Sequence, residues 1–204
     1  SGGTRDMYGE VLKFGAQIVD ALVDYRNPVF IYIPPGGELR GGSWVVIDPK
    51  INPTVMEMYA DVESRGGILE PAGIVEVKFK QQQRKDMMRR LDEKLIAMDA
   101  ELKAATGAAA REEIQARLAA REEQLQPLYT QVACEFADLH DRSQRMKAKG
   151  VIREGLEWRR AREFFYWRVT NRLLQQEAVK GVMEADPCMS LTAAKELVAT
   201  WVPE

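Results

Sequence analysis

The most suggestive chemical feature of this 204-residue chain is a pair of adjacent glycines, Gly41 and Gly42, in the stretch GGELRGGSWVVID at 36–48. The pair follows an apolar run, Val29–Ile33, and two prolines, and it leads into a second apolar run at 44–47. We therefore expect two buried strands joined by a glycine turn. Because glycine has no Cβ, such a turn exposes backbone N–H groups that can stabilise a developing oxyanion. The alternative is a plain tight turn, since a lone glycine pair is weak evidence for chemistry.

Conventional catalytic groups are scarce. Ser43 lies beside the glycine pair but does not form a GxSxG nucleophile motif. The only acid–base or nucleophilic candidates near recognisable motifs are His140, Cys134 and Glu70, and a lone helical histidine more often has a structural role. The cysteines, Cys134 and Cys188, lack metal-ligand spacing, so no metal site is expected.

The composition is that of an ordinary globular protein, with 46% hydrophobic and 29% charged residues. A net charge of −2 gives no electrostatic case for nucleic acid, and no apolar run approaches the ~20 residues of a membrane span. Two thiols without a disulfide pattern favour a reducing compartment, and we expect a cytoplasmic location, with a plastid as the alternative. Because the chain opens on Ser-Gly-Gly, we interpret it as part of a larger polypeptide.

The elements that must position the glycine pair begin with a first glycine turn, Gly2–Gly3, and an amphipathic helix over 7–25. Gly15 lies on the apolar face of that helix together with Ile18. A glycine inside a helix costs roughly 1 kcal/mol against alanine, so we expect it to admit a close neighbour. The order of glycine turn, helix, strand, glycine turn and strand predicts an α/β unit, in which ligands collect at the ends of elements.

The remainder of the chain predicts mostly helices. We expect a short helix over 54–60 capped by Asn52, a strand over 74–79, and a helical hairpin over 80–149 that turns near Gly107. A third helix, expected over 157–176, combines aromatic and arginine side chains. This combination is compatible with nucleic-acid binding. We favour the alternative, a packed helix whose arginines pair with nearby glutamates. A last short helix is capped by Ser190. The predicted domain division is 1–79, 80–150 and 151–204.

Five stretches carry a resemblance to a known family. The chain resembles the C-terminal half of the carboxyltransferase domain of eukaryotic multidomain acetyl-CoA carboxylase over residues 1–172. The matching stretches are SGGTRDMYGEVLKFGAQIVDALVDY, PVFIYIPPGGELRGGSWVVIDPKINP, MEMYADVESRGGILEPAGIVEVKF, FADLHDRSQRMKAKGVI and EFFYWR.

The resemblance implies an α/β fold of the crotonase-like kind, a superhelix of β-β-α units, with a long helical hairpin as an extension. It also implies that carboxybiotin on a carrier domain donates its carboxyl group to acetyl-CoA, which gives malonyl-CoA for fatty acid synthesis. Backbone amides, not a side-chain base, would stabilise the developing oxygen charges. This agrees with the lack of a recognisable nucleophile–base pair in the sequence. The implied partners are the N-terminal carboxyltransferase lobe, a second protomer and the biotin carboxyl carrier domain, with no metal, nucleic acid or membrane.

Matched position by position, the resemblance assigns backbone-amide roles to four glycines: Gly2, Gly3, Gly41 and Gly42. It assigns the pocket for substrate or inhibitor to six residues: Gly15, Ile18, Trp44, Val45, Ile68 and Glu70. The family's WRGFSGG motif contains an arginine, thought to hold the carboxylate of carboxybiotin, that would precede Ser1 and is absent from the sequence. The chain alone is therefore expected to hold half a site and to be inactive without the N-terminal lobe.

Two other functions remain open from the sequence. The chain could be a non-catalytic module for dimerisation and for docking of the biotin carrier. It could also be another crotonase-fold acyl-CoA enzyme, a hydratase or isomerase, which would need a glutamate base beside a glycine turn. Glu38 is the only near candidate for that base, and its position does not match the one expected.

Overall fold

The structure is a computed structural model that describes residues 3–202. Its elements form two compact units. The first unit consists of Ser1–Gly66 and Arg142–Glu204, and the second consists of Gly67–Asp141. The division predicted from the sequence, at residues 79 and 150, stays a prediction, because compactness alone does not define independently folding domains.

A parallel three-stranded sheet lies at the centre of the first unit. Its strands are β1 (Val29–Ile33), β3 (Met56–Asp61) and β5 (Glu154–Leu156), in the order β1-β3-β5. The register places Ile31 opposite Met58 and Tyr59 opposite Glu154. Every residue of β3 is buried, as expected for the central strand of a sheet that is covered on both faces.

The central strand corrects the helix predicted over 54–60. Met56, Met58 and Ala60 alternate with Glu57 and Tyr59. The segment therefore has a period of two, and its successive side chains point to opposite faces of the sheet. Asn52 caps a different element. Its amide Nδ2 donates to the carbonyl oxygens that end the preceding helix, those of Leu22 at 3.0 Å, Val23 at 3.2 Å and Tyr25 at 2.9 Å.

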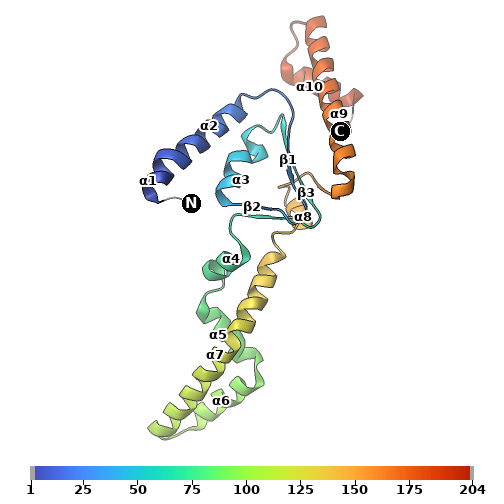
Figure 1. The fold of residues 1–204 in the computed structure, drawn as a ribbon. Helices are drawn as coiled ribbons and strands as arrows, with labels where there is room; N and C mark the ends of the chain where they lie inside the picture. The colour runs from blue at the N-terminus through green and yellow to red at the C-terminus, as the bar shows by residue number, and fades with distance from the viewer. Residues whose placement is uncertain (1–2, 203–204) are drawn as a thin grey trace. The chain divides into compact units, whose positions relative to one another are not determined.

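The two faces of the sheet carry different side chains. On one face Ile33, Met58 and Ala60 form an aliphatic core with Met146 and Ile152. On the other face the rings of Phe30, Tyr32 and Tyr59 pack against aromatic side chains of the long helix α9 (Trp158–Ala185). Figure 1 shows α9 on one side of β1 and β3 and α3 on the other. The third helix predicted from its aromatic residues is thus present, and it is longer than the predicted 157–176.

The N-terminal helical segment is confirmed near its predicted bounds. It consists of α1 (Thr4–Asp6), a π-helical stretch (Met7–Val11) and α2 (Leu12–Val23). The remaining elements of this unit are β2 (Glu38–Arg40), α3 (Gly41–Ile47), a 3-10 turn (Pro49–Ile51), α8 (Ser143–Ala148) and α10 (Leu191–Trp201), with β4 (Arg65–Gly67) at its boundary. The cap predicted for the last helix is confirmed, since Oγ of Ser190 accepts a hydrogen bond from the backbone N–H of Ala193 at 3.2 Å.

The strand predicted over 44–47 is wrong, because these residues belong to the helix α3. Gly41, with φ of +37°, turns the chain directly from β2 into that helix. Trp44 then donates from Nε1 to Oδ2 of Asp48 at 3.0 Å, a contact of i to i+4 spacing that a helix brings within reach. The strand β5 was not predicted, because three residues are too few to show a period.

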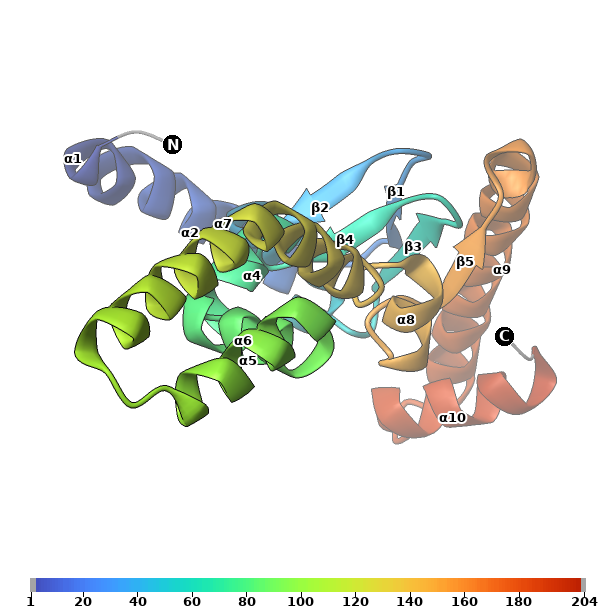
Figure 2. The same cartoon turned by 90° about the horizontal axis from the view of Figure 1, so that it is seen from below.

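Apart from Gly67, the last residue of β4, the second unit is helical in its regular structure. It contains α4 (Pro71–Lys78), α5 (Gln81–Leu91), α6 (Glu93–Ala104) and α7 (Ala108–Asp138), and Figure 2 shows α5, α6 and α7 side by side. Met88, Leu95 and Leu118 form its core. The turn predicted near Gly107 is confirmed, and the predicted hairpin is a three-helix arrangement with a break between α5 and α6.

The strand predicted over 74–79 is also wrong. Pro71 opens α4, and the helix buries Val75 alone among its residues. Proline at the first helical position is favoured because its missing N–H has no acceptor there in any helix. Among residues 3–202, no helix has the length and apolar character that crossing a bilayer requires.

Candidate functional site

The glycine pair lies at the start of the helix α3. Gly41 is the first residue of α3 and Gly42, which is exposed, is the second. The first N–H groups of a helix have no acceptor within the helix, so they remain available to an outside oxygen. No heavy atom of the described residues comes within 4 Å of the Cβ position of Gly42, apart from its chain neighbours and its own helix backbone. The geometry therefore leaves open space beside backbone donors, which is the arrangement that oxyanion stabilisation needs.

Helix α2 reaches this region through Gly15. A Cβ placed on Gly15 would lie 3.4 Å from Cγ1 of Val46 in α3. The close neighbour expected from a glycine on an apolar helix face is thus confirmed. The contact sets the distance between α2 and the helix that begins with Gly41 and Gly42.

Trp44 fixes α3 from its inner side. Its ring packs against Gly66, and a Cβ on Gly66 would come within 2.8 Å of the ring atom Cζ3 and within 2.6 Å of Sδ of Met146. The Trp44 indole N–H is held by Asp48. Gly66 was not singled out in the sequence, because nothing in the pattern RGG tells which glycine meets a buried side chain.

The other predicted site residues fall in three places. Ile18 and Val45 present exposed side chains on α2 and α3, with exposed fractions of 46% and 67%. Ile68 and Glu70 belong to the second unit, where Ile68 is 79% exposed and Glu70 directly precedes α4. Gly3 directly precedes α1 with open space at its Cβ position. Gly2 lies outside the described residues.

Side-chain bases are not gathered at the glycine pair. Glu38, the candidate base of a hydratase, is bound by Arg40, whose Nε lies 3.0 Å from Oε2 of Glu38. Nδ1 of His140 lies 3.1 Å from the carbonyl oxygen of Phe136, and the two rings contact each other edge to face. Within residues 3–202, no cluster of three or more His, Cys, Asp or Glu side chains is arranged to hold a metal ion.

The buried ionisable groups of the first unit lie on the face of the sheet that α9 covers. Burial acts to raise the pKa of Glu57, but hydrogen bonds from Arg168 and Tyr59 and the charges of Arg168 and Arg153 outweigh it, so the pKa is lowered. Burial and the hydrogen bond to Glu57 raise the pKa of Tyr59. Burial, helped by the Asp61 carboxylate, raises the pKa of Tyr32 to about 12. These groups hold the sheet and α9 together and do not reach the aliphatic face on which Trp44 packs.

Comparison with known proteins defines the class of the chain. Residues 1–173 match the family model described as the carboxyl transferase domain. The chain therefore belongs to the carboxyl transferase domain family, and the crotonase-like α/β class implied by the resemblance is confirmed by this match.

Among individual proteins, the chain is similar to acetyl-CoA carboxylases of two yeasts. It is 51% identical to "Acetyl-CoA carboxylase, mitochondrial" of Saccharomyces cerevisiae (strain ATCC 204508 / S288c) over 98% of this chain and 9% of that protein. It is 49% identical to "Acetyl-CoA carboxylase" of Schizosaccharomyces pombe (strain 972 / ATCC 24843) over 100% of this chain and 9% of that protein. The resemblance to the carboxyltransferase region of acetyl-CoA carboxylase is thereby confirmed, and the chain spans about a tenth of the length of these relatives.

A solved structure of transcarboxylase 12S, with methylmalonyl-coenzyme A and methylmalonic acid bound, matches 77% of this chain and 23% of its own. The TM-score is 0.46 and the sequence identity 13%.

The expected cellular location has to be corrected. Relatives at 51% identity are named mitochondrial acetyl-CoA carboxylase, which points to mitochondria and contradicts the expectation of cytoplasm or plastid. A reducing environment, inferred from two unpaired thiols, does not distinguish these compartments.

Proposed function

We propose that this chain is the C-terminal part of the carboxyltransferase of acetyl-CoA carboxylase, which transfers the carboxyl group from carboxybiotin to acetyl-CoA to give malonyl-CoA. The observation that carries the proposal is the match of residues 1–173 to the carboxyl transferase domain, together with about 50% identity to acetyl-CoA carboxylases over nearly the whole chain. The open helix start at Gly41 and Gly42 supports the same function, because it offers the donors that the chemistry needs.

The residues of α3 fit an oxygen that gains negative charge. Carboxybiotin supplies the carboxyl group when it is bound. The backbone N–H groups of Gly41 and Gly42 donate hydrogen bonds to the charged oxygen, and the partial positive charge of the helix start adds to their effect. The missing side chain of Gly42 leaves room for that oxygen.

Apolar residues around the glycine pair have a different task. The exposed side chains of Val45 on α3 and of Ile18 on α2 present apolar surface, while Trp44 packs inward against the aliphatic core. Exclusion of water by such a surface strengthens each hydrogen bond to the charged oxygen. The pocket roles that the resemblance implies for Ile68 and Glu70 stay predictions, since both residues belong to the second unit.

We infer that the active enzyme needs partners. The N-terminal helical segment exposes several large apolar side chains, among them Tyr8 at 80%, Leu12 at 59% and Phe14 at 51%. Large apolar side chains exposed in one short segment are typical of an interaction site. We propose that the N-terminal carboxyltransferase lobe, a second protomer and the biotin carrier domain complete the site.

The test is an assay of carboxyl transfer from malonyl-CoA to free biotin. The 204-residue chain is assayed alone, then mixed with the separately produced N-terminal lobe, and the full-length polypeptide serves as the positive control. We expect no transfer by the chain alone and biotin-dependent transfer in the mixture and in the full-length protein. Hydration or isomerisation of an acyl-CoA thioester, without biotin-dependent transfer, would contradict the proposal.

A further inference from the structure

Gly66, a buried residue of the strand β4, lies against two side chains that leave no room for a Cβ. A Cβ at this position would lie 2.6 Å from Sδ of Met146 and 2.8 Å from Cζ3 of Trp44. Nonbonded carbon atoms are attracted at ~3.5–4.0 Å and repel each other at distances this short. The backbone of Gly66 does not have a positive φ, so crowding, and not the backbone conformation, calls for glycine here.

The two neighbours of Gly66 differ in how they can respond to an added atom. Met146 belongs to the aliphatic core, and its flexible thioether chain can adopt another rotamer. Trp44 is a rigid double ring, and its Nε1 donates to Oδ2 of Asp48 at 3.0 Å. Asp48 directly follows α3, so this hydrogen bond ties the ring to its own helix. A displacement of the ring is therefore passed on to α3.

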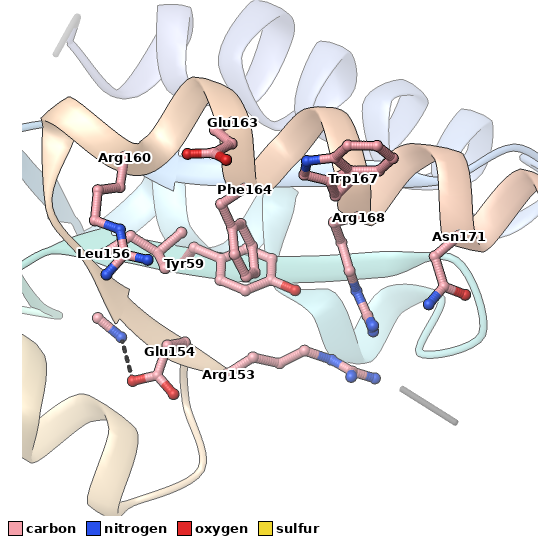
Figure 3. A pocket seen from close by; sticks show the side chains of 11 residues that line it. Tyr59, Arg153, Glu154, Leu156, Arg160, Glu163, Phe164, Trp167, Arg168 and Asn171 are labelled. Atoms are coloured by element: carbon pink, nitrogen blue, oxygen red, sulfur yellow. Dashed lines mark hydrogen bonds between the residues drawn. The ribbon is translucent and has the colours of Figure 1, made fainter. Parts of the chain in front are cut away.

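The sheet on which Trp44 packs is held from its other face. Figure 3 shows Tyr59 and Phe164 between the strands and α9, and their ring centroids lie 5.1 Å apart. Oη of Tyr59 donates to Oε2 of Glu57 at 2.6 Å, and Arg168 binds the same carboxylate. Close-packed interiors transmit a displacement because they have little empty space to absorb it. We therefore expect an added Cβ to move α3 and not the sheet.

The strand that contains Gly66 also holds the chain directly before α3. β4 pairs with β2 in a two-stranded sheet, and the backbone N–H of Arg65 donates to the carbonyl oxygen of Gly37 at 3.0 Å. β2 ends at Arg40, and α3 begins at the next residue, Gly41. The same short strand therefore contacts both the entry into α3 and, through Gly66, the ring on the inner side of that helix.

We propose that Gly66 is a positioning residue for carboxyl transfer. Its missing side chain sets how closely Trp44 approaches β4, and thereby where the backbone N–H groups at the start of α3 lie. The inference rests on the function proposed for the glycine pair at 41 and 42, and it adds a residue outside that pair. A misplacement of about 1 Å can cost ~100-fold in rate. Because these donors act on charge that develops in the transition state, their displacement should lower kcat more than it raises KM.

The test is carboxyl transfer from malonyl-CoA to biotin by full-length enzyme that carries Gly66→Ala, with the folded fraction measured by circular dichroism. At equal folded fraction we expect kcat to fall about tenfold or more and KM for malonyl-CoA to stay within about threefold. Gly155→Ala is the matched control, because Gly155 also lies in a short strand of the same unit, β5. Apart from its chain neighbours, the nearest atom to its Cβ position is Oγ of Ser143 at 3.9 Å. This control should keep both constants within about twofold.

A smaller ring at position 44 shows whether the contact with Trp44 is responsible. Trp44→Phe removes the atom Cζ3, so adding Gly66→Ala to Trp44→Phe should cost less than about threefold in kcat. This comparison also serves if Gly66→Ala does not fold by itself. The inference would be overturned by an unaltered kcat in folded Gly66→Ala, by a loss confined to KM, or by a loss of about tenfold in both backgrounds. An absence of transfer by the unaltered full-length enzyme would instead contradict the proposed function, and this inference with it.

Discussion

Arg168 binds Glu57 through two of its nitrogens, with Nε 2.9 Å and Nη2 2.8 Å from the two carboxylate oxygens. The pair joins the central strand β3 to the helix α9 across a buried face of the sheet. The side chain of Glu57 is 1% exposed and that of Arg168 is 9% exposed. Two parallel hydrogen bonds between buried charges fix both the distance and the orientation of the two elements.

Removal of Arg168 should therefore destabilise the first unit. We expect Arg168→Met to lower the free energy of unfolding by roughly 3–5 kcal/mol, because it leaves a buried carboxylate with poorer compensation. The control is Lys180→Met, since Lys180 contacts Glu184 at 3.9 Å with both side chains about two-thirds exposed. That exposed pair is worth about 1 kcal/mol or less. Urea denaturation, monitored by circular dichroism, measures the stability of both variants. Equal unfolding midpoints for Arg168→Met and Lys180→Met would contradict the account.

The same carboxylate predicts a dependence of stability on pH. The pKa of Glu57 is lowered in the folded state from its ordinary value of 4.5. A lowered folded pKa means that the stabilisation is fully present above the unfolded pKa and is lost as pH falls through the folded value. The difference in unfolding free energy between the unaltered chain and Glu57→Gln should therefore be constant near neutral pH and shrink below about pH 4.5. A difference that stays constant down to about pH 3 would show that Glu57 does not titrate with folding.

The contact between Gly15 and Val46 predicts opposite outcomes for two substitutions. Gly15→Ala adds a Cβ at an ordinary contact distance of 3.4 Å, so we expect unchanged activity of the full-length enzyme and a stability gain of up to ~1 kcal/mol. Gly15→Leu forces α2 away from α3 and should lower turnover by about tenfold or more, because small displacements of catalytic groups are costly. Turnover of malonyl-CoA with biotin, corrected for the folded fraction, measures both. Equal activity of the two variants would contradict the proposed role of the contact.

Local sequence patterns predicted the long helices more reliably than the strands. The segments 7–25 and 157–176 have a helical period over several turns, and the structure has helices there. In contrast, the strand β3 was read as a helix, because Met56, Met58 and Tyr59 also suit a helix when its partners are unknown. In the sheet β3 lies between β1 and β5, which are distant from it in sequence. This pairing, and the burial that follows from it, cannot be recognised from the local sequence.

The glycines of the candidate site were recognisable, but their geometry was not. Gly41 and Gly42 were expected between two strands, and they open a helix instead. The role of Gly66 depends on the packing of Trp44 and Met146 against it, which no local pattern encodes. The bidentate pair of Glu57 and Arg168 joins residues 111 positions apart, so it could not be predicted from the sequence alone.

Conventional acid–base groups should be dispensable for the reaction. We expect His140→Gln and Cys134→Ala in the full-length enzyme to keep turnover within about tenfold, since general acid–base groups contribute ~10²–10⁴-fold where they act. His140 contacts Phe136 and its backbone carbonyl in the second unit, so any loss should come from packing. Turnover at saturating donor, corrected for the folded fraction, checks this. A thousandfold loss in His140→Gln with unchanged stability would reveal a side-chain base.

The central claim is that backbone N–H groups at the start of α3 stabilise the oxygen that gains negative charge. Gly42→Val in the full-length enzyme tests this claim most directly. The matched control is Gly107→Val, because Gly107 also lies at a helix start with open space at its Cβ position. A valine at 42 fills the space beside the N–H groups, and loss of one oxyanion donor costs ~10²–10³-fold in rate. We measure carboxyl transfer from malonyl-CoA to biotin for both variants at equal folded fraction. The account predicts a fall of about a hundredfold or more for Gly42→Val and a rate within about threefold of the unaltered enzyme for Gly107→Val; near-normal transfer by Gly42→Val would contradict it.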